Sequence, residues 1–433
     1  MEKIIVAGAG HGGLVAAAHF AKAGYDVTVY EKNAREDLGY DWQDTMGRSA
    51  FSRSGVPDLP QEELVDYYAM SFNSPSWKVK LVPEEPFLGS IAKVERKVLI
   101  KHLVDFAESC GVKFVFGAEI SCALYNSDRV TGILYRTADS TLPDAADMII
   151  DAAGMRSPVR TSLPDEFGVE KTIDDSDVFY GYRAYFDRVP GENAEGINDI
   201  MLYELGNPGM NWITVEGEYV DVLIGSFGHI EQELIDDTLA DLRDHFPILG
   251  SKVLRGGQIA EIPLRKPASM FVCNGYAAVG DSAFMTETMS GSGITMSMRA
   301  GKMLADTIIY GKEDRFDIDN LWNYQSTYMR FIGNGQLDNH VIRSMLSGLT
   351  EDDLNYLLDN KVLTDKEFCN NPGSYSAQDM INKGLAVIKN PALIKLFASA
   401  GVKLAAAQRY KPMIPYNYNK AKISAANRAY AQF

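Results

Sequence analysis

Residues 3–13 read Lys-Ile-Ile-Val-Ala-Gly-Ala-Gly-His-Gly-Gly, and this stretch decides the fold. Its first part is a short run rich in β-branched residues, which is typical of a strand buried on both faces of a sheet. Small and apolar residues at helical spacing follow from Gly12, and Gly24 is a natural residue at the end of a helix. An alternating run over 26–30 predicts a second strand. The sequence therefore predicts a strand–loop–helix–strand unit at the N-terminus.

The glycines of the predicted loop have the GxGxxG spacing of a dinucleotide-binding turn, at Gly8, Gly10 and Gly13. The first glycine allows a tight turn, the second lets a pyrophosphate approach the backbone, and the third allows close contact between helix and strand. The helix N-terminus adds free N–H groups and a partial positive charge. Glu31 closes the second strand, where a carboxylate can accept hydrogen bonds from both ribose hydroxyls. Glycines that merely make a turn explain this spacing less well.

A second glycine-rich turn lies far downstream. Gly280-Asp281 ends another apolar strand, and Met289-Ser-Gly-Ser-Gly-Ile-Thr295 then opens a helix. Two such turns predict one extended dinucleotide rather than two separate ligands. An ordinary turn whose Asp caps a helix accounts for Asp281 alone, but poorly for the pair.

The rest of the chain predicts an α/β fold with three parts. We expect a Rossmann-type domain split over 1–170 and 255–312, an antiparallel-sheet substrate domain over 171–254, and a helical C-terminal region over 313–433. Residues 34–90 show little periodicity and are interpreted as an irregular insertion. Further strands are predicted over 113–116, 119–125, 129–136, 147–152, 178–187, 199–204, 211–215 and 219–227. Helices are predicted over 98–111, 297–310, 320–332 and 377–407.

Charge is distributed unevenly along the 433 residues. The formal net charge of −16 argues against broad nucleic-acid binding, which needs a positive surface. Residues 380–433 contain nine basic side chains and no acidic one, so residues 1–379 carry −16 − 9 = −25. We interpret this basic segment as helices docked on the acidic body, or as the same contact made across a homodimer. An anionic ligand or a membrane surface is the alternative, which we do not favour.

The chain shows no secretory, membrane or metal-binding pattern. The segment after Met1 lacks the layout of a signal peptide, and no run of eighteen apolar residues occurs, so we expect a soluble cytoplasmic protein. The four cysteines are scattered without a CxxC pair or a histidine at metal-ligand spacing. They predict buried free thiols, with no disulfide framework and no metal site. The positions are Cys110, Cys122, Cys273 and Cys369.

Four patches of the sequence resemble the large FAD-dependent oxidoreductase family that contains geranylgeranyl reductases, para-hydroxybenzoate-type monooxygenases and flavin-dependent halogenases. The patches are Val6 to Gly13 with Glu31; Val94-Glu95-Arg96 before a helix; Asp151 to Arg160; and Gly280-Asp281-Ser282 through Gly293-Ile294. The resemblance implies that FAD is the dinucleotide. It further implies that Glu31 holds the adenosine ribose, that Arg96 lies near the phosphates, and that Asp281 holds ribityl or pyrophosphate oxygens. Gly291 to Ile294 would line the flavin.

These patches together define the predicted cofactor-binding residues. They are Gly8, Gly10, His11, Gly12, Gly13, Glu31, Lys32, Arg96, Gly154, Gly280, Asp281, Gly291, Gly293 and Ile294.

The sequence departs from the family pattern at points that bear on the reaction. Hydroxylases of the family carry Ala-Asp-Gly in the third patch, but this chain has Ala153 at the aligned position. Ala153 therefore argues against direct use of NADPH. Because no second GxGxxG serves a nicotinamide domain, a protein electron donor is the alternative. The tryptophan motifs of the halogenase and prenyl reductase branches are represented by Trp212 alone. Glu261-Ile262-Pro263 followed by Gly280-Asp281 is similar to the reductase branch.

We therefore predict an FAD-dependent oxidoreductase acting on an apolar or aromatic small-molecule substrate, most like a geranylgeranyl reductase. A monooxygenase and a non-catalytic FAD-binding protein are the alternatives. No general acid or base is assigned, because the spacing of the available groups identifies none of them. The groups considered as proton donors are His229, His340, Tyr180, Tyr182 and Tyr203, and His11 is interpreted as packing against the cofactor. Five methionines near the second turn fill either the core or an adaptable pocket, namely Met285, Met289, Met296, Met298 and Met303.

Overall fold

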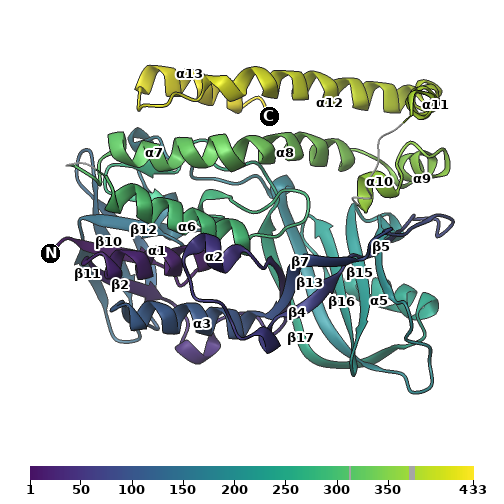
Figure 1. Cartoon of the computed structure of the whole chain (residues 1–433), viewed down its shortest axis with the longest axis horizontal. Helices are drawn as coiled ribbons and strands as arrows, with labels where there is room; N and C mark the ends of the chain where they lie inside the picture. Colours follow the sequence, from purple (N-terminus) through teal and green to yellow (C-terminus); the bar gives the residue numbers. More distant parts are fainter. Residues whose placement is uncertain (312–313, 370–375) are drawn as a thin grey trace.

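The computed structural model describes residues 1–311, 314–369 and 376–433, and Figure 1 shows their arrangement. One half of the molecule is built on a six-stranded sheet in the order β18-β19-β12-β1-β2-β8. Its strands are β1 (Lys3–Ala7), β2 (Asp26–Glu31), β8 (Lys113–Phe116), β12 (Met148–Asp151), β18 (Val272–Cys273) and β19 (Tyr276–Ala278). All neighbours pair in parallel except β18 and β19. With α1 (His11–Lys22) between β1 and β2, the predicted N-terminal unit is confirmed.

Three helices accompany this sheet: α1, α3 (Arg96–Ser109) and α6 (Ile294–Ile309). The axes of α1 and α6 come close because glycine stands on both helices. A Cβ atom on Gly12 would lie 2.6 Å from the Ser297 carbonyl oxygen, and one on Gly301 would lie 2.1 Å from the Gly12 carbonyl oxygen. A side chain at position 12 would therefore clash with α6. Glycine is needed there for the packing of the two helices more than for the turn of the loop.

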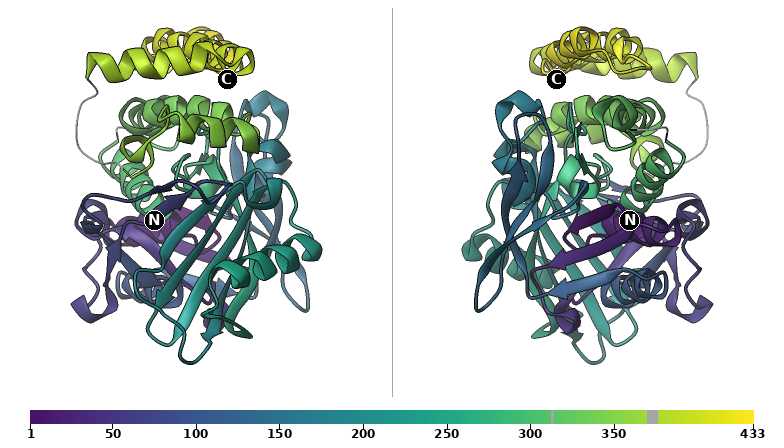
Figure 2. Two further views of the ribbon diagram at one scale, coloured as in Figure 1. Left: turned by 90° about the vertical axis from the view of Figure 1, so that its right-hand side faces the viewer. Right: turned by 90° about the vertical axis from the view of Figure 1, so that its left-hand side faces the viewer.

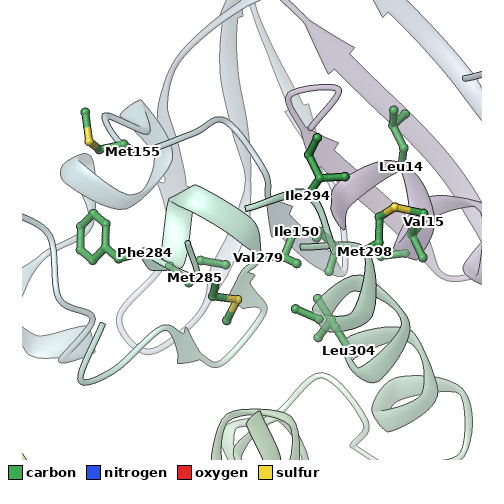
Figure 3. Close-up of a cluster of buried hydrophobic side chains, with 14 of the residues drawn as sticks. Leu14, Val15, Ile150, Met155, Val279, Phe284, Met285, Ile294, Met298 and Leu304 are labelled. Carbon is green, nitrogen blue, oxygen red and sulfur yellow. The ribbon is translucent and has the colours of Figure 1, made fainter. Parts of the chain in front are cut away.

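The apolar core continues between these helices and the sheet. Figure 3 shows part of it, formed by Leu14, Val15, Ile150, Met155, Val279, Phe284, Met285, Ile294, Met298 and Leu304. Met285 and Met298 are fully buried, whereas Met289 is 42% exposed. Two of the five methionines therefore belong to the core, and Met289 lies at the surface of the second glycine-rich turn.

The second half of the molecule is a seven-stranded sheet in the order β17-β13-β16-β15-β14-β5-β6. Its strands are β5 (Ser71–Asn73), β6 (Lys80–Leu81), β13 (Val178–Arg188), β14 (Asn198–Leu202), β15 (Gly209–Glu216), β16 (Tyr219–Phe227) and β17 (Leu249–Pro263). Neighbours pair antiparallel except β14 and β5. Helix α5 (Gln232–His245) connects β16 to β17. The predicted antiparallel sheet is confirmed.

Residues 34–90 are more regular than expected. The expectation of an irregular insertion is wrong, because this stretch contains several short strands. These strands are too short to show an alternating pattern, and their partners lie far away in the sequence. Strands β3 (Gln43–Gly47) and β4 (Val65–Tyr68) pair with β7 (Phe87–Glu95), and β5 and β6 extend the second sheet. A short helix, α2 (Ala50–Ser54), lies between β3 and β4.

A second three-stranded sheet follows α3, with β9 (Glu119–Tyr125), β10 (Val130–Arg136) and β11 (Thr141–Ala145). Residues 255–263 pair along β13 in the seven-stranded sheet, although the predicted division places them with the Rossmann-type domain. The domain limits remain a prediction, and the limit at 312 falls outside the described residues.

The C-terminal region is helical, as expected. It comprises α7 (Ile318–Tyr328), α8 (Asn334–Leu346), α9 (Glu351–Asp359), α10 (Asp365–Phe368), α11 (Ala377–Ile388), α12 (Pro391–Tyr410) and α13 (Lys420–Tyr430). The predicted helix 320–332 runs on through a π-helical segment, Met329–Gly333, into α8. The single helix expected over 377–407 is wrong, since α11 and α12 meet at an angle of 118°. Asn390 caps α12 and Pro391 is its first residue, an arrangement that starts a new helix.

The basic segment is docked on the rest of the chain, which agrees with the first interpretation of its charge. Figures 1 and 2 show α11, α12 and α13 as an outer layer beyond α7 and α8. Lys411 pairs with Asp338 of α8 at 2.5 Å, and the Trp322 indole N–H donates to the Pro415 carbonyl at 3.0 Å. Ile423 and Tyr430 of α13 are buried.

No single helix in the described part of the chain is long and apolar enough to cross a membrane; one bent pair, Gln378–Ile388 with Pro391–Met413, meets that test in length and composition. The four cysteines are free thiols, but Cys273 alone is fully buried and the other three are partly buried. The expectation of buried thiols therefore holds for one position.

Candidate functional site

The phosphate loop lies where β1 ends and α1 begins. Gly8 has a φ of 86°, in the left-handed region, and its N–H donates to the Tyr30 carbonyl on β2 at 2.7 Å. The N-terminus of α1 has no side-chain cap and no acidic residue in its first turn. The first N–H groups of a helix have no partner within the helix and carry a partial positive charge. This end of α1 is therefore suited to an anion such as a phosphate.

A neighbouring loop explains why this turn needs glycine. A Cβ atom would lie 2.7 Å from the Ala152 carbonyl oxygen if built on Gly8, and 2.8 Å from the same oxygen if built on Gly10. On Gly13 it would lie 2.5 Å from the Ala152 side chain. The loop that follows β12 thus packs against all three glycines. Close packing was expected at Gly13 alone.

Glu31 joins the loop to the end of β2. Its carboxylate is 8% exposed, and its two oxygens accept the N–H groups of Ala9 and Asn33, each at 2.9 Å. Each oxygen keeps a second lone pair that can accept a ribose hydroxyl. Lys32 is exposed beside it and, with Asn33 and Gly117, lines an open hollow beyond the strand.

Arg96 and Asp44 form a charged pair in the site. Arg96 donates two hydrogen bonds to the Asp44 carboxylate, one of them from Nη2 at 2.9 Å. The Arg96 guanidinium lies 5.6 Å from the centre of the Tyr40 ring, which stacks on Trp42 at 4.2 Å. Burial opposes ionisation of Asp44, but the Arg96 charge and hydrogen bonds outweigh it and hold the pKa of Asp44 below its ordinary value. The pair is therefore ionised at neutral pH.

The Arg96 charge also acts on His11 and Asp281. Burial, and then the Arg96 charge, lower the pKa of His11 to about 3, so this imidazole is neutral at physiological pH. Its Nε2 atom is buried without a hydrogen-bond partner in the part of the chain that the structure describes. A buried polar atom without a partner is costly, so this nitrogen is suited to contact a polar ligand.

Asp281 lies at the N-terminus of α6. Thr286 Oγ1 donates to Asp281 Oδ1 at 2.9 Å, and a Cβ atom on Gly293 would lie 3.5 Å from the same carboxylate oxygen. Burial raises the pKa of Asp281, and the Thr286 hydrogen bond opposes part of that rise. The Gly154 N–H donates to Ser282 Oγ at 2.9 Å. This bond brings the third and fourth sequence patches into contact.

Helix α6 repeats the arrangement of α1. It begins at Ile294, and its N-terminus likewise has no side-chain cap and no acidic residue in its first turn. Gly280 has a φ of 67°, and a Cβ atom there would lie 2.9 Å from Ser297 Oγ, so this glycine brings the strand end close to the helix. The two uncapped helix ends follow β1 and β19, the strands that flank β12, and α1 packs against α6.

The seven-stranded sheet supplies an apolar wall opposite this second turn. A Cβ atom on Gly291 would lie 3.7 Å from the Leu264 side chain and 3.8 Å from the Ile262 side chain. Both belong to an apolar cluster on the sheet, formed by Phe179, Leu223 and Leu264 with the partly buried Met210, Trp212, Phe227 and Ile262. An apolar group next to the Gly291 turn would therefore contact apolar side chains from the sheet.

Farther along the same face the wall becomes polar. Arg183 Nε donates to Asp221 Oδ1 at 2.9 Å, and its guanidinium lies 5.0 Å from the Trp212 ring. Arg183 also donates to the Gln43 carbonyl, and the Gln43 N–H donates to the Tyr185 hydroxyl at 3.0 Å. These bonds fix the sheet against β3, next to Asp44.

The structure therefore brings the predicted cofactor-binding residues to one region, with Lys32 at its exposed edge and Gly12 in the helix contact. It adds residues that the sequence analysis did not assign to a site, namely Tyr40, Trp42, Asp44, Arg183 and Thr286. Tyr40 and Trp42 lie in the stretch 34–90, which was expected to be an irregular insertion. Asp44 and Arg183 carry no local signal, since their partners lie far away in the sequence.

The residues considered as proton donors lie apart. His229 is exposed, and its ring contacts Tyr180 at 5.7 Å. His340 is buried, its Nε2 pairs with the Phe433 carbonyl at 2.8 Å, and burial lowers its pKa to about 3. The Tyr203 hydroxyl donates to the Leu346 carbonyl at 2.8 Å, and Tyr182 alternates with Arg183 and so lies on the opposite face of the sheet. The Tyr180 hydroxyl accepts a hydrogen bond from Arg156 of the third patch at 3.3 Å, and among the described residues the other four make no hydrogen bond to that patch.

Glu204 is a buried acid that has a role in stability rather than in the site. It accepts a hydrogen bond from Asn211, which alternates with Trp212 and so lies on the face away from the apolar wall. Burial raises the pKa of Glu204 to about 8, and the nearby Asp241 carboxylate adds to the rise.

Glu204→Gln should remove this pH dependence. Because the pKa is higher in the folded protein than its ordinary value of 4.5, the acid's contribution to stability is complete below pH 4.5 and is lost as pH rises to about 8. The amide stays neutral and can still accept from Asn211. We expect a Tm gain of roughly 1–3 °C at pH 8.5 and little change at pH 5, by thermal unfolding. An equal effect at both pH values would contradict the assignment.

Comparisons with known proteins identify the class. Residues 6–51 match a family model described as an NAD(P)-binding Rossmann-like domain. The digeranylgeranylglycerophospholipid reductase of Sulfolobus acidocaldarius is 23% identical over 377 residues, covering 84% of this chain and 81% of that protein. Digeranylgeranylglycerophospholipid reductase 2 of Methanopyrus kandleri is 26% identical over 353 residues, covering 76% and 83%.

Solved structures share the fold. A geranylgeranyl bacteriochlorophyll reductase-like protein from Thermoplasma acidophilum superposes with a TM-score of 0.72 at 18% identity, covering 92% of this chain and 100% of that one. The myxobacterial chondrochloren halogenase, described as FAD-dependent, gives a TM-score of 0.58 at 19% identity, covering 89% and 96%. The chain thus shares its fold with flavin-dependent oxidoreductases and is similar in sequence to reductases. Within that class it is similar to the geranylgeranyl reductase group, as the sequence patches indicated.

Proposed function

We propose that this chain is an FAD-dependent reductase that saturates carbon–carbon double bonds in the isoprenoid chains of a glycerophospholipid. The observation that carries the proposal is the apolar wall of Ile262 and Leu264 facing Gly291 at the start of α6. An aliphatic chain can be buried there next to the turn assigned to the flavin. The similarity to reductases whose names specify digeranylgeranylglycerophospholipid supports the choice of substrate.

The residues present fit FAD. A dinucleotide with two phosphates needs an anion site, a ribose acceptor and a second polar site at its flavin end. The uncapped N-terminus of α1 and the Arg96 charge supply the first, Glu31 the second, and Asp281 with Thr286 the third. The Nε2 atom of His11, which has no hydrogen-bond partner among the described residues, would be a further polar contact for the cofactor.

When bound and reduced by its electron donor, the flavin would supply a hydride to one carbon of the double bond and return to oxidised FAD, while a proton would complete the other carbon. The chain's own residues hold the reactants in place and exclude water. The apolar cluster on the sheet desolvates the alkene, and the Arg183–Asp221 pair fixes that sheet against β3. The α6 N-terminus directs partial positive charge toward the turn from Gly291 to Gly293, where it can stabilise a reduced, anionic cofactor.

The sequence of the loop after β12 bears on which electron donor reduces the flavin. Ala153 stands where the hydroxylase branch carries an aspartate, and a Cβ atom on Gly8 would lie 2.9 Å from the Ala153 Cα atom. The alanine side chain therefore leaves no charged group at that position of the third patch for a nicotinamide cofactor. We therefore infer that a protein electron donor, rather than NADPH, reduces the flavin at a useful rate.

An anaerobic titration tests the reaction. The purified protein is mixed with a glycerophospholipid bearing geranylgeranyl chains, and NADH, NADPH, dithionite or a reduced ferredoxin is added. We expect flavin bleaching by dithionite and ferredoxin, slow bleaching by NADPH, and lipid products that gain one H2 per reduced double bond in mass spectrometry.

Other outcomes would overturn the proposal in distinct ways. Rapid bleaching by NADPH would contradict only the assignment of a protein electron donor, and not the reaction. Oxygen-dependent products carrying an added oxygen atom would replace the reductase with a monooxygenase. Flavin that bleaches fully while the lipid stays unchanged would exclude this substrate.

A further inference from the structure

Helix α11 exposes its apolar side to the outside of the molecule. Four large apolar residues are more than half exposed: Met380 at 57%, Ile381 at 55%, Leu385 at 53% and Ile388 at 65%. At 100° per residue they fall on one side of the helix, within an arc of about 140°. The other side contacts the protein, since Ala386 is buried against α9 and its carbonyl accepts the Tyr356 hydroxyl at 2.9 Å. A surface helix of a globular protein normally has the reverse arrangement.

Helix α12 continues this outer surface after the 118° bend. Its inward residues Leu393, Ala400 and Ala407 are buried, whereas Ile394 is 41% exposed and Val402 is 71% exposed. Figures 1 and 2 show that α11 and α12 lie in the same outermost layer, on the side of α7 and α8 away from the sheets. We call the exposed side of α11 and α12 the outer face.

Basic side chains border the outer face without acidic partners. Lys389, Lys395, Lys403 and Arg409 are exposed and form no ion pair among the residues that the structure describes. No acidic residue occurs in 380–433, whereas residues 1–379 carry −25. The outer face is therefore a positive, aliphatic surface on an otherwise acidic protein.

We propose that the outer face binds the surface of an anionic lipid bilayer, with α11 and α12 lying in the plane of the interface. The aliphatic side chains would enter the acyl boundary while the lysines and Arg409 contact lipid phosphates, which is the pattern of an interfacial amphipathic helix. A two-fold dimer through this face is less compatible with the charges, because it would place the same basic residues opposite their own copies.

This proposal uses residues outside the flavin site and stands apart from the proposed reaction. If that reaction is correct, the outer face brings the enzyme to the membrane in which a glycerophospholipid substrate resides. Binding is measured without any electron donor, so failure of binding and failure of catalysis are distinguishable.

The test is co-sedimentation of the full chain with phosphatidylcholine vesicles that contain phosphatidylglycerol, or with phosphatidylcholine alone. We expect at least about tenfold tighter binding to the anionic vesicles, weakened by salt. The variant Ile388→Asp with Lys395→Glu should bind about tenfold or more weakly than the wild type. The matched control, Leu254→Asp with Lys252→Glu, makes the same changes on exposed residues of β17 and should bind like the wild type.

Thermal unfolding and flavin content establish that both variants are folded, because the substituted side chains are exposed in each. Absence of wild-type binding to anionic vesicles would overturn the proposal, as would an equal loss of binding in the control. A wild-type dimer that the α11–α12 variant dissociates, with no vesicle binding by either, would assign the outer face to self-association instead.

Discussion

Gly10→Val should yield a folded protein that purifies without its yellow cofactor. Gly10 has a φ of −69°, which any residue adopts, so the backbone itself tolerates a side chain. The surrounding space does not tolerate a side chain, because a Cβ atom on residue 10 would lie 2.8 Å from the Ala152 carbonyl oxygen. The phosphate loop must then move away from the loop after β12. We expect flavin affinity to fall at least about 100-fold, equivalent to about 2.7 kcal/mol, by absorbance titration of the apoprotein with FAD.

Two alanine variants distinguish a clash in the phosphate loop from general destabilisation of α1. Gly10→Ala adds the same Cβ atom with no further bulk, and Gly24→Ala adds one just beyond the other end of the helix. No atom lies within 4 Å of a Cβ atom at Gly24, but its φ of 91° strains an alanine. We expect Gly24→Ala to lower Tm without loss of flavin and Gly10→Ala to weaken flavin binding. Full-strength FAD binding by Gly10→Val would refute the assignment of the loop.

The N-terminal unit was predictable because all of its signals are local. The strand, the glycine spacing, the helix and the residue that closes the second strand lie within 31 residues, and each has its own periodicity or residue type. The second glycine-rich turn was predictable for the same reason. The Gly154 to Ser282 hydrogen bond joins the loop after β12 to this second turn across 128 residues, and no local pattern indicated that contact.

Other parts of the site have no local signal. Arg96 was expected near phosphates, but its partner Asp44 lies on β3 in a stretch without clear periodicity. Strands such as β5 and β6 have three and two residues, which is too short for alternation to be recognised. They exist because the edge of the seven-stranded sheet provides their hydrogen-bond partners. Tertiary context, and not propensity, decides such strands.

The break between α11 and α12 does have a signal in the sequence. Asn390-Pro391 is a cap followed by the residue most suited to a first helical position, in a run otherwise favourable to helix. The apolar residues on both sides have the spacing of one continuous helix. The structure shows that those on α11 are exposed, so apolar spacing there indicates a surface and not a core.

Ile262→Asn should impair turnover of a long isoprenoid lipid far more than it affects the flavin. Ile262 lies opposite Gly291, with its Cγ2 atom 3.8 Å from the position of a Cβ atom there, and it is partly buried in the apolar cluster. Replacing it removes apolar contact with the substrate and leaves a polar amide to be desolvated. Burying a side chain of this size contributes about 1.5–3 kcal/mol, so kcat/KM should fall roughly 10- to 150-fold.

The matched control is Ile259→Asn on the same strand. Ile259 is 40% exposed and pairs with Tyr182, whereas Ile262 pairs with Phe179, so the two isoleucines lie on opposite faces of the sheet. Ile259→Asn should leave kcat/KM unchanged. Both variants should be bleached by dithionite like the wild type, because neither residue is assigned to the cofactor. If Ile262→Asn turns over the lipid normally, or if both variants lose activity equally, the substrate does not use this wall. If the loss grows with the length of the isoprenoid chain, it reports apolar contact along the sheet, because each added methylene extends the buried surface.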